Sequence, residues 1–426
     1  MNGLQRVKLN FSSIQRIINN NSWTLVQRNN TMHVIPSRWI LVVKIDANTG
    51  KRRYKARFVV KGFKQLNGVD YFDDQVSSSV LAAKSLRIIL VIAVNGGYEL
   101  HHMDAVSAFT QATLDQDIYA EQPEGFEQGM MLVCKLNKAV YGLKQASYLW
   151  QKDVKAFMII NSWTPCKLDE NLYYRYSHTN HLMMVGTYVD DILSAYHPDD
   201  KKEFMLFVDS MKKRFTLKEI GAPTSILGMR VLYDTRQRVL SLDHYQYIDQ
   251  LLLRYNMKNA KISATPASEE LLGPEHCPSM ESEKRIMQQQ YPYRKLMGEL
   301  IYLANTSRPD ISHIVGVLSR FTENPGKKHW EAAKRVLRYL AGTQEVGLMF
   351  HGTHRNTNKA FQIEGYSDAD WGRDMHGRKS IYGFIIHLNG CPIAWASKKQ
   401  SFVAQSTCES EYVGMSETVR EIRWVY

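Results

Sequence analysis

Three acidic residues occupy positions where an acid lowers stability. Asp104 follows a strand-like run and precedes the apolar AVSAF, and Asp190 and Asp191 are adjacent between MMVGTYV and ILSAY. Neighbouring carboxylates repel each other, and a low-dielectric surrounding strengthens the repulsion unless cations neutralise them. The alternative is a turn that merely tolerates the Asp-Asp pair, because Asp is common in turns.

Carboxylates in this arrangement suit hard divalent cations. Mg²⁺ binds one or two carboxylates and keeps coordination positions for substrate phosphates, and Mn²⁺ accepts the same oxygen ligands. Two such ions can stabilise the attacking and leaving oxygens of a phosphoryl transfer. The sequence therefore predicts a two-metal site with Asp104, Asp190 and Asp191 as ligands, provided that the two strand ends lie side by side.

Periodic apolar residues predict the elements that position these acids. We expect a helix over 82–96, a strand ending near Asp104, two strands across 181–196, and a helix with its apolar face at Phe204, Phe207, Val208, Met211 and Phe215. The pattern is helical from Asp243 to about Gly342, interrupted by a Pro-, Ser-, Glu- and Gln-rich stretch at 258–290 that we expect to be a loop. The last eighty or so residues return to strands before a final helix.

Positive charge exceeds negative charge, with 54 Lys and Arg against 42 Asp and Glu and a formal net charge of +12. From Arg38 to Lys64 there are nine basic residues and one acid, on two β-rich runs joined by ANTGKRR. This pattern predicts a basic hairpin. The excess favours a polyanionic partner, with an ordinary basic surface as the alternative.

The cysteine pattern and the apolar runs exclude several classes of protein. The five cysteines are far apart with no C-x-x-C pair, which favours reduced thiols over a zinc knuckle or a disulfide framework. The longest apolar run, IILVIAV at 88–94, is far shorter than the roughly 20 residues that span a bilayer. The N-terminus lacks an apolar signal-peptide core, so we expect no secretion and no membrane insertion.

Several segments resemble, in order and spacing, the reverse transcriptase of copia-type retrotransposon Pol polyproteins. They are RYKARFVVKGFKQ (53–65), MDAVSAF (103–109), VYGLKQASYLW (140–150) and YVDDI (188–192), with PYRKLMGELIYLANTSRPDI (292–311) and YSDADWGRD (366–374) downstream. The resemblance extends from about Asn21 to the last residue. It implies an α+β right-hand polymerase with fingers, palm and thumb, followed by a truncated ribonuclease H-like α/β domain.

The same resemblance implies a division of the chain. We expect an N-terminal extension at 1–20, fingers and palm at 21–242, a helical thumb or connection at 243–345, and the ribonuclease H-like part, truncated at its C-terminus, at 346–426. The chain would then be a fragment of a longer polyprotein. The basic side of the expected helix at 328–341 would track a nucleic acid duplex, although a solvated amphipathic helix explains that segment equally well.

The resemblance also assigns roles to single residues. Asp104, Asp190 and Asp191 match the metal-binding aspartates of the family. Phe109 matches the bulky residue that excludes a 2′-hydroxyl, although an isolated Phe is more often a core residue. Lys218 is a loosely aligned candidate for the acid that protonates pyrophosphate, and a surface lysine is the better interpretation.

Three further residues match nucleotide-binding positions of the family. Lys55 and Arg57 fall in the fingers strand that contacts the triphosphate, where an ammonium or a guanidinium suits phosphate. Gln145 matches a nucleotide-contacting glutamine, and Gly142 beside it permits close backbone approach.

Asp368 and Glu411 match the first two acids of the family's ribonuclease H. Further acids of that site would follow Tyr426, so we expect that this activity is lost.

The function implied is an RNA-directed DNA polymerase that uses two Mg²⁺ ions, or Mn²⁺, and transfers nucleotides from dNTPs. Its partners would be an RNA template and a DNA primer or duplex. The alternative is a catalytically inactive, nucleic-acid-binding remnant of a transposon. We expect a location in the cytoplasm, within a virus-like particle, or in the nucleus. The sequence leaves the oligomeric state open.

Overall fold

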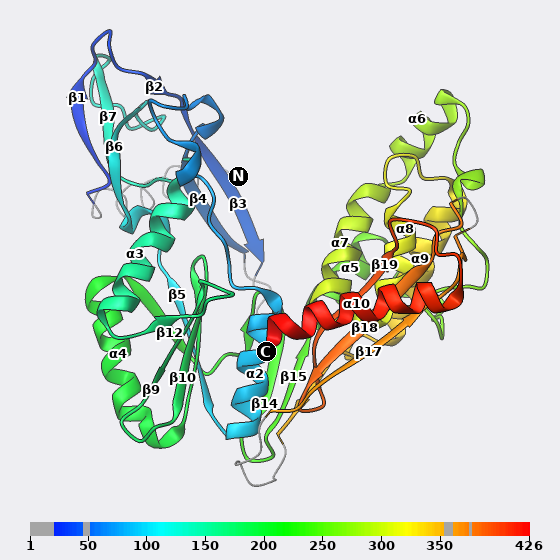
Figure 1. Ribbon diagram of the computed structural model, residues 1–426. Coiled ribbons are helices and arrows are strands. Elements are labelled where there is room, and N and C mark those ends of the chain that lie inside the picture. Colours follow the sequence, from blue (N-terminus) through cyan, green and yellow to red (C-terminus); the bar gives the residue numbers. More distant parts are fainter. Residues whose placement is uncertain (1–20, 46–51, 353–360, 375–376) are drawn as a thin grey trace. The chain divides into compact units, whose positions relative to one another are not determined.

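The computed structural model describes residues 21–45, 52–352, 361–374 and 377–426 (Figure 1). They form two compact units. The first contains the described residues up to Ala82 together with Leu100–Ala222, and the second contains Ala83–Glu99 and Pro223–Tyr426. The segment 21–242, predicted as fingers and palm, therefore contributes to both units. The predicted extension at 1–20 lies outside the described residues.

Two small sheets form one part of the first unit. The expected basic hairpin is present as β3 (Ser37–Ile45) and β4 (Arg52–Val60), paired antiparallel, and its connecting residues lie outside the described part. A four-stranded sheet of order β1-β7-β6-β2 accompanies it. Its strands are β1 (Trp23–Gln27), β2 (Val34–Ile35), β6 (Thr113–Ala120) and β7 (Leu132–Lys138).

A six-stranded sheet of order β12-β5-β11-β10-β9-β8 forms the rest of the first unit. Helices α3 (Ala146–Ile160) and α4 (Lys201–Arg214) contribute buried residues to its apolar core. The predicted apolar face at 204–215 is buried in that core, which confirms the helix. The strands are β5 (Glu99–Ala105), β8 (Thr164–Pro165), β9 (Leu172–Tyr176), β10 (Leu182–Tyr188), β11 (Asp191–Tyr196) and β12 (Leu217–Gly221).

The second unit begins with the predicted first helix, α2 (Ala83–Gly96). Its four-stranded sheet has the order β13-β14-β15-β16, so the strand after the helical region pairs with one before it. The strands are β13 (Ser225–Ile226), β14 (Met229–Asp234), β15 (Val239–Asp243) and β16 (Leu348–His351).

The helical region of the second unit has its own apolar core. It contains α5 (Tyr245–Arg254), α7 (Tyr293–Thr306), α8 (Ser312–Ser319) and α9 (Lys327–Gly342). The prediction of a loop over 258–290 is wrong for its last ten residues, which form α6 (Glu281–Gln290). Met287 is the one buried residue of α6, and a single apolar anchor produces no helical period in the sequence.

The C-terminal strands and helix form as expected. Strands β17 (Ile363–Ala369), β18 (Ile381–Leu388) and β19 (Cys391–Lys399) pair antiparallel in that order, which leaves β17 at the sheet edge. Figure 1 shows α10 (Thr407–Val425) lying across β17 and β18. The five cysteines are free. Among the described residues, no helix has the length and apolar character that a membrane span requires.

Candidate active site

A two-residue turn joins β10 to β11 and carries the acidic pair. Tyr188 pairs with Asp191 across the hairpin, so Val189 and Asp190 form the turn. Val189 has φ 55°, a left-handed conformation that is strained for a β-branched residue. The indole nitrogen of Trp150, on α3, donates a hydrogen bond of 2.6 Å to the carbonyl oxygen of Val189. A buried contact from α3 thus stabilises the strained turn.

Strand β5 brings the third acid to this turn. The backbone nitrogen of Ala105 donates a 2.7 Å hydrogen bond to the carbonyl oxygen of Asp190, so the residue before it, Asp104, lies beside the turn. The two strand ends therefore lie side by side, which is the condition on which the predicted site depends. Asp190 is exposed, and Asp104 and Asp191 are half-buried. In the described structure, these three acids do not form a group whose carboxylate oxygens all lie within 4.8 Å of one another.

His102 is a neighbour of the acids that the sequence prediction missed. Its Nε2 lies 2.8 Å from Oδ1 of Asp191, and the ring is buried. Alternate residues of a strand share one face, so His102 and Asp104 lie on the same face of β5. That spacing of two was the signal available in the sequence. His101, on the opposite face, lies 3.0 Å from Oε1 of Glu219 instead.

Tyr141 connects several predicted site residues and was also missed. Its ring centre lies 5.0 Å from that of Phe109 and 5.7 Å from the guanidinium carbon of Arg57. Burial raises the pKa of the Tyr141 phenol; Asp190 and Asp104 raise it further, while Arg57 opposes them. The phenol therefore lies within the electrostatic influence of two of the acids and of Arg57 on β4. In the sequence, the position of Tyr141 within the VYGLKQ motif was the one sign that it lies near the site.

Two basic residues of β4, Lys55 and Arg57, were predicted to contact the nucleotide, and the structure describes the side chain of Arg57. Arg57 is half-buried on β4, while the side chain of Lys55 lies outside the described part.

Gln145 is buried rather than presented at a surface. Its side chain is 1% exposed; its Nε2 donates to the carbonyl oxygen of Asp70 at 2.8 Å, and its Oε1 accepts from Gln65 at 3.0 Å. Contact with a nucleotide would require this network to open. The close backbone approach expected at Gly142 is to β4, where the Val60 nitrogen donates to the carbonyl oxygen of Tyr141 at 2.9 Å.

The remaining candidates lie away from the turn or at its edge. Lys218 on β12 is exposed and pairs opposite Asp104 on β5. Asp368 is exposed on β17, and Glu411 is half-buried on α10. In the described ranges, no third His, Cys, Asp or Glu forms a ligand group with these last two acids.

Comparison with known proteins identifies the family. Residues 20–269 match the family "Reverse transcriptase (RNA-dependent DNA polymerase)", which is more than half of the 426 residues. The chain belongs to the reverse transcriptase family. It is 38% identical over 424 residues to a retrovirus-related Pol polyprotein from transposon TNT 1-94 of Nicotiana tabacum, covering 99% of this chain and 31% of that protein.

Two further reverse transcriptase relatives extend the match. The Pol polyprotein from transposon RE1 of Arabidopsis thaliana is 35% identical over 420 residues, covering 97% of this chain and 27% of that protein. The putative transposon Ty5-1 protein of Saccharomyces cerevisiae is 30% identical over 323 residues, covering 75% of this chain and 100% of that protein. The predicted kinship with copia-type retrotransposon Pol polyproteins is confirmed. The chain spans about a third of the TNT 1-94 and RE1 polyproteins.

Solved structures confirm the fold. A foamy viral protease-reverse transcriptase in complex with double-stranded DNA aligns with a TM-score of 0.51 at 12% identity, covering 96% of this chain and 60% of that chain. The α+β polymerase fold expected for this reverse transcriptase is therefore present.

Proposed function

We propose that this protein is an RNA-directed DNA polymerase that adds deoxynucleotides from dNTPs to a primer paired with an RNA or DNA template. The supporting observation is the 2.7 Å hydrogen bond from Ala105 to Asp190, because it joins the ends of the two strands that carry the three acids. Family membership supplies the reaction class, and this geometry supplies a site for it.

The donor set of the site fits hard cations. Asp104, Asp190 and Asp191 offer only carboxylate oxygens, the ligands preferred by Mg²⁺ and Mn²⁺. These three residues would hold two ions, which would neutralise charge that develops during phosphoryl transfer. His102 orients one oxygen of Asp191 and leaves its other oxygen for a ligand.

Residues around Tyr141 provide the rest of the proposed nucleotide site. Arg57, and Lys55 two residues before it on β4, supply positive charge for the triphosphate. Phe109 would exclude a 2′-hydroxyl, and the Tyr141 ring packed against it at 5.0 Å would limit its movement. Gln145 is buried, so it would affect the nucleotide site indirectly, through its hydrogen bond with Gln65.

A nucleic acid duplex is the proposed partner. The foamy viral structure of the same fold is a complex with double-stranded DNA. The predicted apolar stripe of α9 is buried, so that its basic residues lie on the remaining faces, where Lys327 and Lys328 are exposed. Such a face neutralises phosphates without reading sequence. We propose that it contacts the primer–template duplex.

A primer-extension assay tests the proposal. The chain, a DNA primer on a polyribonucleotide template, dNTPs and Mg²⁺ are combined, and extended primer is measured on a denaturing gel. Template-dependent extension is the expected result. Salt-sensitive binding of the duplex without extension at any concentration of Mg²⁺ or Mn²⁺ would instead favour an inactive, nucleic-acid-binding remnant.

The loss of ribonuclease H activity stays a prediction. Asp368 and Glu411 lie in no group of three ligand residues in the described part of the chain, and a two-metal site with only these two acids should bind its ions weakly. The expected location in a virus-like particle or the nucleus also stays a prediction.

His102→Gln should weaken the use of Mg²⁺ rather than the fold. Residues that orient a metal ligand typically change metal affinity by about 10- to 100-fold, so we expect half-maximal extension to need about tenfold more Mg²⁺. A Mg²⁺ titration of the initial extension rate measures this. His101→Gln is the matched control, since its partner is Glu219 and not a proposed ligand. Equal Mg²⁺ requirements for both variants would contradict a positioning role for His102.

Phe109→Ala should relax discrimination against ribonucleotides. Removal of the ring opens space for a 2′-hydroxyl, and we expect the preference for dNTPs over rNTPs to fall by about 10- to 100-fold. The ratio of kcat/KM for a dNTP and the matching rNTP measures this preference. Phe126→Ala is the control, because that ring packs on Trp39 instead. An unchanged ratio in Phe109→Ala would rule out the proposed steric role.

A further inference from the structure

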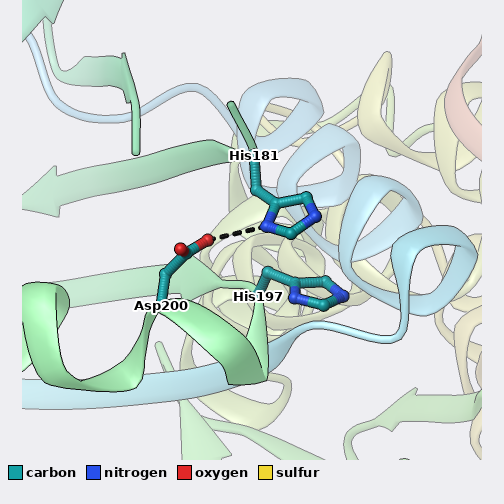
Figure 2. A group of neighbouring side chains, drawn as sticks. All are labelled: His181, His197 and Asp200. Atoms are coloured by element: carbon teal, nitrogen blue, oxygen red, sulfur yellow. Dashed lines mark hydrogen bonds and ion pairs between the residues drawn. The ribbon is translucent and has the colours of Figure 1, made fainter. Parts of the chain in front are cut away.

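A second cluster of ligand-type side chains lies at the open end of the β10–β11 hairpin. His181 immediately precedes β10, His197 follows β11, and Asp200 immediately precedes α4 (Figure 2). One nitrogen of each imidazole and one carboxylate oxygen all lie within 4.8 Å of one another, the one such group of three in the described ranges. Six residue steps along β10 separate this end from the acidic turn, about 20 Å.

The three side chains are already oriented toward one another. Nδ1 of His181 lies 2.8 Å from Oδ2 of Asp200, and the two imidazole rings stack with centres 3.9 Å apart and 27° between their planes. Figure 2 shows both rings on the same side of the Asp200 carboxylate. Asp200 is 3% exposed at its side chain, while His181 and His197 are 34% and 25% exposed. An ion could therefore reach a pair of imidazoles backed by a buried carboxylate.

We propose that His181, His197 and Asp200 bind a divalent transition-metal ion of the Zn²⁺ class. Two imidazoles and one carboxylate form a set that Zn²⁺ and Co²⁺ prefer, whereas Mg²⁺ prefers oxygen ligands alone. Ligands of a tetrahedral Zn²⁺ ion lie about 3.3 Å apart, and the three ligand atoms here lie within 4.8 Å of one another. Three protein ligands leave a fourth position for water.

A hydrogen-bonded network without metal is the competing explanation. The Thr179 hydroxyl donates to the second oxygen of Asp200, so both carboxylate oxygens already have partners. His197 is held by separate contacts: it stacks on His181, and its Nδ1 accepts a 3.3 Å hydrogen bond from the backbone nitrogen of Asp199 and lies 3.4 Å from the Asp199 carboxylate. The two explanations differ in whether removing the His197 nitrogens changes metal affinity.

The proposed ion would join three elements. It would link the start of β10 and the end of β11 to the start of α4, and so close the end of the hairpin that lies opposite the acidic turn. Because a ligand bound only by the folded state stabilises that state, Zn²⁺ should raise the Tm of the full chain.

Titration of the EDTA-treated full chain with Zn²⁺ by calorimetry, and with Co²⁺ by visible absorption, tests the site. Saturating Mg²⁺ and an Asp190→Asn background remove competition from the acidic turn. His197→Phe keeps a ring against His181 without ligand atoms, and Asp200→Asn removes the carboxylate. The control is His178→Phe, from the same turn before β10, where His178 is 93% exposed and outside the cluster.

We expect one ion to bind, with affinity at least about tenfold lower in both His197→Phe and Asp200→Asn and within about twofold of the parent in His178→Phe. If Asp200→Asn fails to fold, His197→Phe decides. Parent affinity in a folded His197→Phe would overturn the proposal. So would an equal loss in His178→Phe, or a thiolate-to-cobalt charge-transfer band, which would locate the ion at a cysteine.

Discussion

Replacement of Asp190 with asparagine is expected to reduce primer extension by about 10³-fold or more, because the amide cannot supply the negative charge that holds a divalent cation. Asp190 is exposed, so the substitution should leave the Tm nearly unchanged. The single-turnover extension rate at saturating Mg²⁺ and dNTP measures the loss. Affinity for the primer–template duplex, measured separately by fluorescence anisotropy, should persist.

A charge-matched control separates the site from general electrostatics. Asp117→Asn removes the same charge from an exposed ion pair with Lys135 on the small sheet of the same unit. Exposed ion pairs contribute about 0–1 kcal/mol to stability, so this variant should extend primers like the parent. Parent-like extension by Asp190→Asn, or a comparable defect in Asp117→Asn, would remove the proposed catalytic role of the acidic turn.

Gly142→Ala is expected to produce the largest loss of stability. Gly142 has φ +96°, and a β-carbon there would overlap the carbonyl oxygen of Val60 on β4. Left-handed backbone strain and overpacking against rigid backbone together cost about 2–5 kcal/mol. Urea unfolding followed by circular dichroism should give a correspondingly lower free energy of unfolding. The displaced Tyr141 should also reduce extension in the variant that remains folded.

Gly125→Ala is the matched control for this substitution. Gly125 has φ +83°, but no atom lies within 4 Å of the position that its β-carbon would take. Only backbone strain applies there, about 1–2 kcal/mol. The difference between the two variants therefore measures the close approach of Gly142 to β4. Equal losses of stability would show that β4 gives way and that this approach contributes nothing.

Local patterns predicted most of the elements and two strand ends of the site. Helix α4 has a clear helical period because it buries one face, and β10 and β11 are recognisable as continuous apolar runs because both of their faces are buried. Helix α6 escaped prediction because it buries one residue. The division into units was also beyond a local pattern: α2 packs with strands β15 and β16, which lie far along the chain.

The acids of the proposed site could be predicted from their own chemistry, whereas residues that would act through a partner could not. Asp104 and Asp190 were identifiable because an acid in an apolar run requires a reason. His102 and Tyr141 contact residues on other elements, as in the 2.8 Å approach of His102 to Asp191. The spacing of His102 and Asp104 indicates a shared strand face, but it does not specify the contact with Asp191. For Gln145 the motif predicted a nucleotide contact. It did not indicate that the side-chain amide is buried and already hydrogen-bonded to the backbone of Asp70.

The left-handed conformation of Val189 would make the proposed catalysis depend on the integrity of the protein interior. A turn of this kind keeps its shape only while its surroundings hold it, and here the Trp150 indole is one of those restraints. Partial loosening of helix α3 would therefore release the turn before the sheet itself melts. On mild heating, the rate of primer extension should therefore fall at a lower temperature than the spectroscopic signal of unfolding. Loss of extension would then detect loosening of the interior before the fold as a whole is lost.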